Sequence, residues 1–414
     1  MASLQPVRGT HDLLPDDSRR HRHLAETARR VAALYGYDEV ATPIFEFSEV
    51  FKRTLGEVSD IVTKEMYSFT DRGGEEITLR PEGTAGIARA LISGGLSQSL
   101  PLKFFYHGPM FRYERPQKGR LRQFHQIGIE LLGVPEPQGD VEAIAVGARL
   151  LAALGIADRT RLELNTLGDG ASRTAYRGAL VAYFSDHRAA LSDDSRVRLE
   201  RNPLRILDSK DEGDRRIVQG APPLADHLNA ESADFFAQVR AGLDDLGLAY
   251  HVNQTLVRGL DYYCHTAFEF TTETLGAQGT VLAGGRYDGL VQTMGGPSVP
   301  GVGWAAGVER LALMPADPPP PPRPVAVVPV GGDAERAVRK LAEELRGAGL
   351  IVELGYRGNL SKRLKRANKL NARFAVILGE DEIARGVATL RDLDSGDQSD
   401  VPLSDLAARL AAPA

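Results

Sequence analysis

The most regular alternation of apolar and polar residues runs from Lys103 to Gly133 and predicts two strands joined by a basic loop, Arg115–Arg120. Successive side chains of a strand point to opposite faces of the sheet. Gln126, Gly128 and Glu130 are therefore expected on one face of the second strand, with apolar residues on the other. On its own, this alternation is typical of a half-exposed sheet with a solvated polar side.

The first strand of this hairpin carries charged residues near its end. Alternation places Arg112 and Glu114 on the same face of that strand. The hairpin is thus expected to present one apolar face and one face that is rich in arginine, glutamine and glutamate.

Upstream of the hairpin, apolar residues recur at helical spacing. Asp16–Ser18 are N-cap candidates for a helix that runs to about Tyr35. Tyr37–Phe47 then has the pattern of a strand, and its Pro43 favours an edge or bulged position. A further short strand is expected to stop at Pro81, just before another helix.

Downstream of the hairpin the pattern changes twice. Residues 168–248 lack strand alternation and predict an inserted helical module. Its basic residues are interleaved with acids, so a salt-bridged surface and a nucleic-acid contact both stay open. Strand patterns return in Leu256–Phe270 and Leu282–Leu290, and Gly301–Leu311 is expected to form a strand that feeds a helix.

A run of prolines at residues 317–324 marks the clearest boundary in the chain. Consecutive prolines form a stiff spacer that suits neither a helix nor a central strand. Residues 1–316 and 325–414 are therefore expected to form separate domains. The second alternates strands with helices and predicts an α/β domain.

The composition narrows the classes of protein. The 414 residues are 43% apolar and 25% charged, as in an ordinary soluble protein of two or three domains. A single cysteine, Cys264, excludes an intrachain disulfide framework and fits a reducing compartment. No stretch has the character of a signal peptide or a membrane span, so a cytoplasmic location is expected.

Charge is distributed unevenly along the chain. The net charge of −5 argues against a protein that coats nucleic acid indiscriminately. Between Arg357 and Arg373, however, every ionisable residue is basic. Such a helix is commonly a solubilising face, and it is equally able to track the phosphates of a nucleic acid.

Several common catalytic motifs are absent from the sequence. It contains no P-loop, nucleophile elbow or paired-ligand zinc motif, so no protein-held metal centre is predicted. The glycines of Gly301–Gly307 are spaced differently from a dinucleotide fingerprint. Cys264 lies in a strand pattern with no identified base, which indicates a buried structural thiol.

Longer stretches carry a family resemblance. GPMFRYERPQKGR followed by RQFHQ resembles motif 2 of class II aminoacyl-tRNA synthetases, in the form used by histidyl-tRNA synthetases. The first helix with its proline-containing strand resembles motif 1, and GVGWAAGVERL resembles motif 3. LVRGLDYYCHTAFEF and LAGGRYDGL resemble two signatures peculiar to the histidyl enzymes. The helical insertion and the C-terminal, anticodon-binding domain also have counterparts in that family.

The resemblance implies a fold, an assembly and a reaction. We expect an α+β catalytic domain built on a mixed, mainly antiparallel sheet with a helical insertion, in a homodimer that uses ATP and Mg²⁺. The reaction would activate L-histidine to histidyl-adenylate, release pyrophosphate and pass histidine to the 3′-terminal ribose of its tRNA. Arginines suit this chemistry because they stay charged and grip phosphate with two N–H groups.

The resemblance also implies which residues bind ATP and catalyse activation. Arg112 is expected to bridge the amino-acid carboxylate and the α-phosphate, and Arg258 to approach the same phosphate from the other side. These two are the implied catalytic residues. The implied ATP-binding set is Arg112, Glu114, Arg120 and Arg310.

Recognition of histidine needs partners for a ring that has one donor and one acceptor. By resemblance, Glu130 and Tyr263 contact the ring. The implied histidine-binding set is Glu82, Gly83, Thr84, Arg112, Gln126, Glu130, Arg258, Tyr262, Tyr263 and Tyr287. Two simpler interpretations stay open: Glu82 suits the first turn of a helix, and tyrosines also pack in ordinary cores.

For tRNA the implied contacts are Gln117, Lys118, Arg357, Lys362, Arg363, Lys365 and Arg366. Two rival functions explain the sequence less well than the ligase does. A catalytically inactive regulatory paralogue typically lacks the C-terminal domain and the arginines, and both are present here. A ligase for another amino acid leaves the two histidine-specific signatures unexplained.

Overall fold

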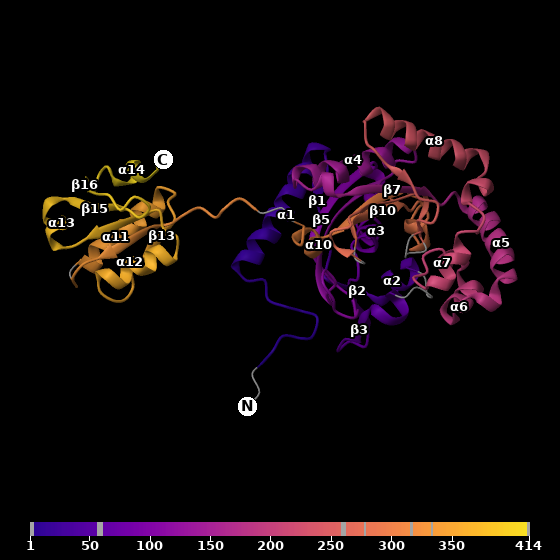
Figure 1. The fold of residues 1–414 in the computed structure, drawn as a ribbon, viewed down its shortest axis with the longest axis horizontal. Helices are drawn as coiled ribbons and strands as arrows, with labels where there is room; N and C mark the ends of the chain where they lie inside the picture. The colour runs from indigo at the N-terminus through magenta and orange to yellow at the C-terminus, as the bar shows by residue number, and fades with distance from the viewer. Residues whose placement is uncertain are drawn as a thin grey trace. The chain divides into compact units, whose positions relative to one another are not determined.

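The computed structural model describes residues 4–55, 61–257, 262–276, 279–314, 318–332 and 334–411. Contacts divide the chain into two compact units, residues 1–318 and 319–414 (Figure 1). The division falls inside the proline run.

The first unit is built on a large mixed sheet. Its outermost strand pairs at each end are parallel, and the pairs between them are antiparallel. This confirms the expected fold class. Among the described residues the sheet has eight strands, in the order β1 (Asp38–Glu39), β5 (Leu102–Phe111), β6 (Gln123–Leu132), β11 (Gly301–Gly307), β10 (Thr280–Arg286), β9 (Cys264–Thr271), β7 (Arg161–Thr166) and β8 (His251–Val252).

The β5–β6 hairpin confirms the predicted pairing and the predicted alternation. Ile127 and Ile129 are fully buried against helices on one face of the sheet, and Gln126 and Glu130 lie on the other. One detail of the prediction is wrong. Strand β5 ends at Phe111, so Arg112 and Glu114 belong to the loop that follows the strand and not to the strand itself.

Helices cover both faces of this sheet. The main core packs α1 (Pro15–Leu34), α4 (Pro137–Ala153) and α8 (Ala230–Asp245) against one face. A second core packs α3 (Thr84–Ser93) and α9 (Leu290–Thr293) against the other face. The short α10 (Val308–Ala312) follows β11 and contacts α1.

The start of α1 differs from the prediction. Leu14 is the N-cap and makes no side-chain capping bond, while Pro15 occupies the first turn. Asp16 and Asp17 lie inside that turn, where negative charge favours the helix dipole without capping.

The strand expected at Tyr37–Phe47 is two strands in different sheets. β1 joins the edge of the large sheet, and β2 (Phe45–Phe47) pairs with β4 (Glu76–Leu79). Pro43 lies between them, where its missing N–H and fixed φ interrupt the ladder. The small sheet has the order β2, β4, β3 (Tyr67–Thr70), and α2 (Ser48–Leu55) follows β2.

The insertion is helical over its described length. α5 (Gly170–Asp186), α6 (Asp193–Arg201) and α7 (Glu212–Val218) share a core of their own, and in Figure 1 they lie together beside the sheet. α8 instead adds Val239 and Leu243 to the main core. The last helix of the insertion is therefore part of the main core of the first unit.

The second unit is an α/β domain. Its sheet has the order β13 (Val352–Leu354), β12 (Val325–Pro329), β14 (Phe374–Leu378), β15 (Val387–Asp392) and β16 (Gln398–Pro402). The first three strands are parallel, and the β15–β16 hairpin, which the sequence pattern did not predict, is antiparallel. The helices are α11 (Ala334–Gly347), α12 (Leu360–Lys369), α13 (Glu380–Arg385) and α14 (Leu406–Ala411).

Candidate active site

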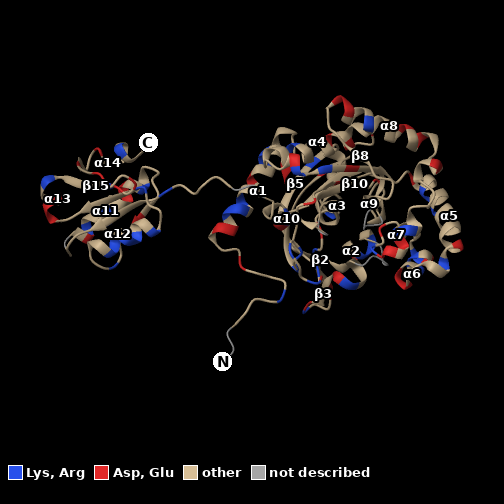
Figure 2. Cartoon of the chain, viewed as in Figure 1, with Lys and Arg blue, Asp and Glu red and all other residues tan. Residues whose placement is uncertain are grey.

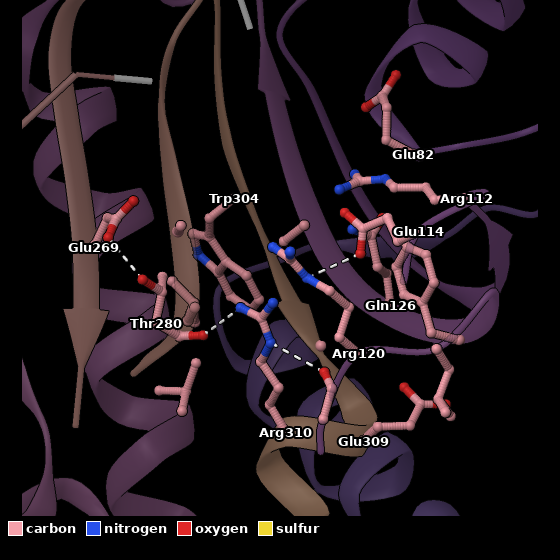
Figure 3. A pocket seen from close by; sticks show the side chains of 18 of the residues that line it. Glu82, Arg112, Glu114, Arg120, Gln126, Glu269, Thr280, Trp304, Glu309 and Arg310 are labelled. Atoms are coloured by element: carbon pink, nitrogen blue, oxygen red, sulfur yellow. Dashed lines mark hydrogen bonds and ion pairs between the residues drawn. The ribbon is translucent and has the colours of Figure 1, made fainter. Parts of the chain in front are cut away.

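A cavity of about 290 Å³ opens where β6, β10 and β11 meet the start of α3 and the loop after β5 (Figure 3). Its lining is strongly charged, with arginines and glutamates from distant parts of the sequence. The residues singled out from the sequence that line it are Glu82, Thr84, Arg112, Glu114, Arg120, Gln126, Tyr262, Tyr263 and Arg310.

The loop between β5 and β6 supplies three of the charged side chains. Arg112 Nε donates to the carbonyl of Pro81 at 2.8 Å, and its guanidinium lies 5.3 Å from the centroid of the Phe124 ring. Arg120 Nε and Glu114 Oε2 are 2.9 Å apart. In the described part of the chain, no carboxylate lies within ion-pair distance of Arg112, so its terminal nitrogens can meet an anionic ligand.

Arg310 reaches the cavity from α10. Its Nη1 donates to the carbonyl of Thr280 at 2.8 Å, and its Nε donates to that of Gly119 at 3.3 Å. Burial, and then the charge of Arg120, lower the pKa of Arg310. An anion bound between these guanidinium groups relieves their repulsion.

Glu82 stands at the start of α3 and has both carboxylate oxygens engaged. Oε2 accepts from the Thr84 backbone N–H at 2.7 Å, and Oε1 accepts from the Ala85 backbone N–H at 2.8 Å. Burial raises the pKa of Glu82, while these two bonds and Arg112 oppose the rise. The helix-start interpretation and a ligand-binding role therefore coexist, because a carboxylate oxygen can accept more than one bond.

Glu130 lies beneath the cavity, buried and held by two hydroxyl groups. Thr84 Oγ1 donates to its Oε1 at 2.6 Å, and the Tyr287 hydroxyl donates to its Oε2. Burial raises the pKa of Glu130 to about 8, against the effect of these two hydrogen bonds. Gly303 on the paired strand leaves room for this carboxylate, since a Cβ there would meet Oε2 at 2.0 Å.

Gln126 and two tyrosines shape the same side of the cavity. The Gln126 side-chain oxygen is buried and has no hydrogen-bond partner among the described residues. The rings of Tyr262 and Tyr263 pack with 4.6 Å between their centroids and a tilt of 46° between their planes, and burial raises the pKa of Tyr262. A buried acceptor without a donor is costly in a folded protein, which indicates a polar ligand at this position.

Some residues expected at the site lie elsewhere or cannot be placed. Tyr287 and Glu130 are behind the lining, and so is Gly83. Gly83 is required by packing, because a Cβ there would meet the Tyr106 ring at 2.4 Å. Arg258 lies outside the described residues.

Sequence reasoning missed several residues that line the cavity. Phe124 supports Arg112, and Glu269 Oε2 accepts from Thr280 Oγ1 at 2.9 Å. Trp304 also lines the cavity while its indole N–H donates to the Ala143 carbonyl at 2.9 Å. Glu269 and Trp304 lie within the segments that carry the family signatures, which was the available signal.

Cys264 is poorly suited to act as a nucleophile. Burial raises the pKa of its thiol to about 12, so the reactive thiolate is scarce at neutral pH. This agrees with the interpretation of Cys264 as a structural thiol.

The basic segment of the second unit forms α12 and the loop before it (Figure 2). Arg363 turns inward and donates to the carbonyl of Pro329, and Arg373 pairs with Asp392 and Asp394. The basic residues of this segment that stay exposed are Arg357, Lys362, Lys365, Arg366 and Lys369. Gln117 and Lys118, in the β5–β6 loop of the first unit, are exposed as well.

A mixed, mainly antiparallel sheet whose strands and adjoining loops bring arginines around one polar cavity is the arrangement expected of a class II aminoacyl-tRNA synthetase. Residues 9–311 match the family model described as histidyl-tRNA synthetase, and residues 324–412 match that of an anticodon-binding domain. The chain belongs to the histidyl-tRNA synthetase family.

Individual relatives agree with this assignment. The chain is 64% identical to a histidine–tRNA ligase of Rhodospirillum rubrum, with 98% of each chain covered, and 61% identical to one of Gluconacetobacter diazotrophicus, with 99% of each covered. Among solved structures it resembles the apo histidyl-tRNA synthetase of S. aureus, with a TM-score of 0.83, 33% identity and coverage of 98% and 99%. None of the helices in the described part of the chain is long and apolar enough to span a membrane.

Proposed function

We propose that the cavity is where this ATP-dependent histidine–tRNA ligase brings histidine and ATP together. In the first step the histidine carboxylate attacks the α-phosphorus of ATP, an O–P bond forms, and pyrophosphate leaves. In the second step a ribose hydroxyl at the 3′ end of tRNA attacks the activated carbonyl and AMP leaves. The first step joins two anions, so fixed positive charge must offset the charge that develops.

The observation that carries the proposal is the convergence of Arg112, Arg120 and Arg310 on one cavity. Arg112 is held at Nε by a backbone carbonyl, which leaves its terminal nitrogens for the carboxylate and the α-phosphate. Arg310 and Arg120, with Glu114, then flank the adenine and the phosphate tail. Arg258 is proposed as the second catalytic arginine on the resemblance of its segment alone.

Histidine would be recognised at the α3 side of the cavity. The buried, unpartnered oxygen of Gln126 and the Glu82 carboxylate are suited to the α-ammonium group, together with the Thr84 hydroxyl. Glu130 and Tyr263 would meet the imidazole. Thr84 and Tyr287 fix the carboxyl group of Glu130, which restricts the orientation that the ring can take.

Mg²⁺ fits this cavity as a companion of ATP. Glu114 and Glu269 are carboxylates on its lining, and Mg²⁺ is commonly held by one or two carboxylates plus substrate phosphates. The ion would neutralise charge on the β- and γ-phosphates.

A homodimer is supported by the small sheet, whose apolar face is exposed and whose polar face is buried. Phe45, Phe47 and Phe69 are 58%, 56% and 49% exposed. On the opposite face, Glu46 pairs with Arg89 of α3. An exposed apolar face of this kind marks an interaction surface, and a second copy of the chain is the occupant that the resemblance to motif 1 implies.

The dimer is tested by Phe47→Glu, with Val197→Glu as the matched control. Val197 is 50% exposed on α6, away from the small sheet. Sedimentation should show Phe47→Glu shifted towards monomer and Val197→Glu unchanged. A wild-type chain that sediments as a monomer contradicts the dimer.

The function is tested by amino-acid-dependent exchange of pyrophosphate into ATP, run separately with each of the twenty amino acids. Only histidine should support rapid exchange. Comparable exchange with another amino acid, or none with histidine, would refute the assignment of the cavity.

A further inference from the structure

A cluster of imidazoles lies on the α1 face of the large sheet and adjoins the cavity at Glu309, which also lines the cavity. One ring nitrogen each of His21 and His125 and one carboxylate oxygen of Glu309 all lie within 4.8 Å of one another. These residues come from α1, β6 and α10. Because His125 directly precedes Gln126 on β6, its side chain points away from the cavity.

A third imidazole extends the cluster. His107 on β5 stacks on His125 with 6.1 Å between ring centroids, and His21 meets His125 edge-on at 5.5 Å. The Nε2 atom of His107 is buried and finds no hydrogen-bond partner in the described part of the chain.

The contact between His125 and Glu309 explains only part of this arrangement. Both carboxylate oxygens of Glu309 accept from the His125 backbone N–H, at 3.0 and 2.9 Å, and Oε1 is 2.9 Å from His125 Nδ1. This pairing fastens α10 to β6 without any ligand. It leaves unexplained why His21 turns towards the pair and why His107 Nε2 is buried without a partner.

We propose that His21, His125 and Glu309, the last of which also lines the catalytic cavity, form a binding site for a divalent transition-metal ion, Zn²⁺ in particular. Two imidazoles and one carboxylate are a common zinc ligand set, with a water at the fourth position. A carboxylate among the histidines favours a cation over an anion. Nitrogen donors disfavour Mg²⁺ and Ca²⁺, which prefer oxygen ligands.

The separation of the donors is compatible with such a site. Ligand atoms around a tetrahedral zinc ion lie roughly 3.3 Å apart, given zinc–ligand distances of about 2.0–2.1 Å. The most distant donors here, at up to 4.8 Å, must approach by about 1.5 Å. Rotation of the His21 side chain and of the Glu309 carboxylate would supply this movement without a change of backbone.

An ion at this position would join three elements that are distant in sequence. α1, β6 and α10 would be cross-linked through one centre, next to Gln126 and Arg310 in the chain. Since the unfolded chain does not hold these donors together, the ion binds the folded state and raises the thermal midpoint.

Calorimetric titration of the untagged, chelator-treated full chain with ZnCl₂, without ATP, tests the site. His21→Asn removes one donor, and His23→Asn is the matched control because His23 lies on the same helix outside the cluster. The wild type and His23→Asn should bind one Zn²⁺ per chain. His21→Asn should bind at least about tenfold more weakly, the scale of loss seen when a metal site is disturbed.

Thermal unfolding gives a second readout that also reports whether each variant folds. Zn²⁺ should raise the midpoint of the wild type and of His23→Asn, should raise that of His21→Asn much less, and Mg²⁺ should have no comparable effect. Equal zinc affinity and equal thermal shifts for the two variants, or no zinc binding by the wild type, would overturn the proposal. Neither measurement depends on ligase activity.

Discussion

Arg286 and Arg112 both lie within the catalytic unit, and they differ in how many of their N–H donors the protein pairs. Arg286 is fully buried and is bound by Asp140 and Asp288, and by the carbonyls of Val134 at 3.0 Å and Glu136 at 3.2 Å. Arg112, at the cavity, has fewer partners: a backbone carbonyl and a ring, and in the described chain no carboxylate pairs with it.

The difference separates two uses of the same side chain. A guanidinium has five N–H donors. When the fold engages them with buried carboxylates, the residue holds elements together, as Arg286 joins β10 to α4. When the fold holds a guanidinium only by its Nε, its remaining donors and its charge are available to a ligand. Loss of the Arg286 pairing should therefore lower stability most, whereas loss of Arg112 should lower catalysis and leave stability nearly unchanged.

The largest effect is expected from Asp140→Ala. This change leaves Arg286 buried without its main carboxylate, and breaking a buried pair in this way costs about 3–5 kcal/mol. Glu114→Ala is the matched control, because it removes the carboxylate from Arg120 in a pair whose two side chains keep 34% and 12% exposure, against 0% and 0% for Arg286 and Asp140. This pair borders the open cavity, where water can solvate the remaining charge, so denaturant titration should show a smaller loss. Equal losses of unfolding free energy in the two variants would contradict the distinction between the buried arginine pair and the pair at the cavity.

The next effect concerns catalysis. Arg112→Ala should lower kcat/KM for histidine-dependent pyrophosphate exchange about 10²- to 10³-fold, as expected when a donor to developing charge is removed. Its thermal midpoint should change little. Arg122→Ala is the control: Arg122 also bonds a backbone carbonyl and lies over a ring, that of Tyr113, but does not line the cavity. Equal loss of exchange in the two variants would remove the role of Arg112.

Local alternation predicted part of this site correctly. The shared face of Gln126 and Glu130 follows from spacing along one strand, and the structure has it. The same rule failed for Arg112 and Glu114 because the strand ends at Phe111, and alternation does not reveal where a strand stops. Strand ends depend on partners elsewhere in the chain.

Contacts between distant segments could not be derived from the sequence pattern. The pairing of β11 with β6 places Gly303 beside Glu130, and nothing local specifies that neighbour. The same holds for Asp140 and Arg286, which are far apart in sequence. The family signatures indicated which segments form the site. Only the folded chain shows that the N–H donors of Arg286 are paired with carboxylates, whereas Arg112 pairs with no carboxylate among the described residues.

Glu130, a buried carboxyl with no arginine partner among the described residues, extends the comparison to pH. Burial raises the pKa of Glu130 from 4.5 to about 8, so the folded protein holds a proton that the unfolded chain releases. The stability linked to this proton is present below pH 4.5 and is lost as the pH rises towards 8.

Glu130→Gln keeps a neutral group of similar shape and should remove this dependence. Between pH 6 and 8 the wild type should lose roughly 2–3 kcal/mol of unfolding free energy relative to the variant. Denaturant titrations of both proteins at the two pH values measure the difference. Parallel pH profiles would show that Glu130 is ionised in the folded protein already at pH 6.

The smallest effect is expected on α12, whose exposed cations, unlike Arg373, pair with no carboxylate among the described residues. If Lys365 and Arg366 contact tRNA phosphates, Lys365→Gln with Arg366→Gln should lower the salt dependence of tRNA binding by about one unit of slope per lost contact. Arg373→Gln removes a cation already paired with Asp392 and Asp394, so it should leave the slope unchanged. Histidine-dependent pyrophosphate exchange should be normal in all variants. Equal slopes for the double variant and the wild type would assign α12 a solubilising role. The presence or absence of a carboxylate partner would then no longer distinguish the surface cations that bind a ligand from those that do not.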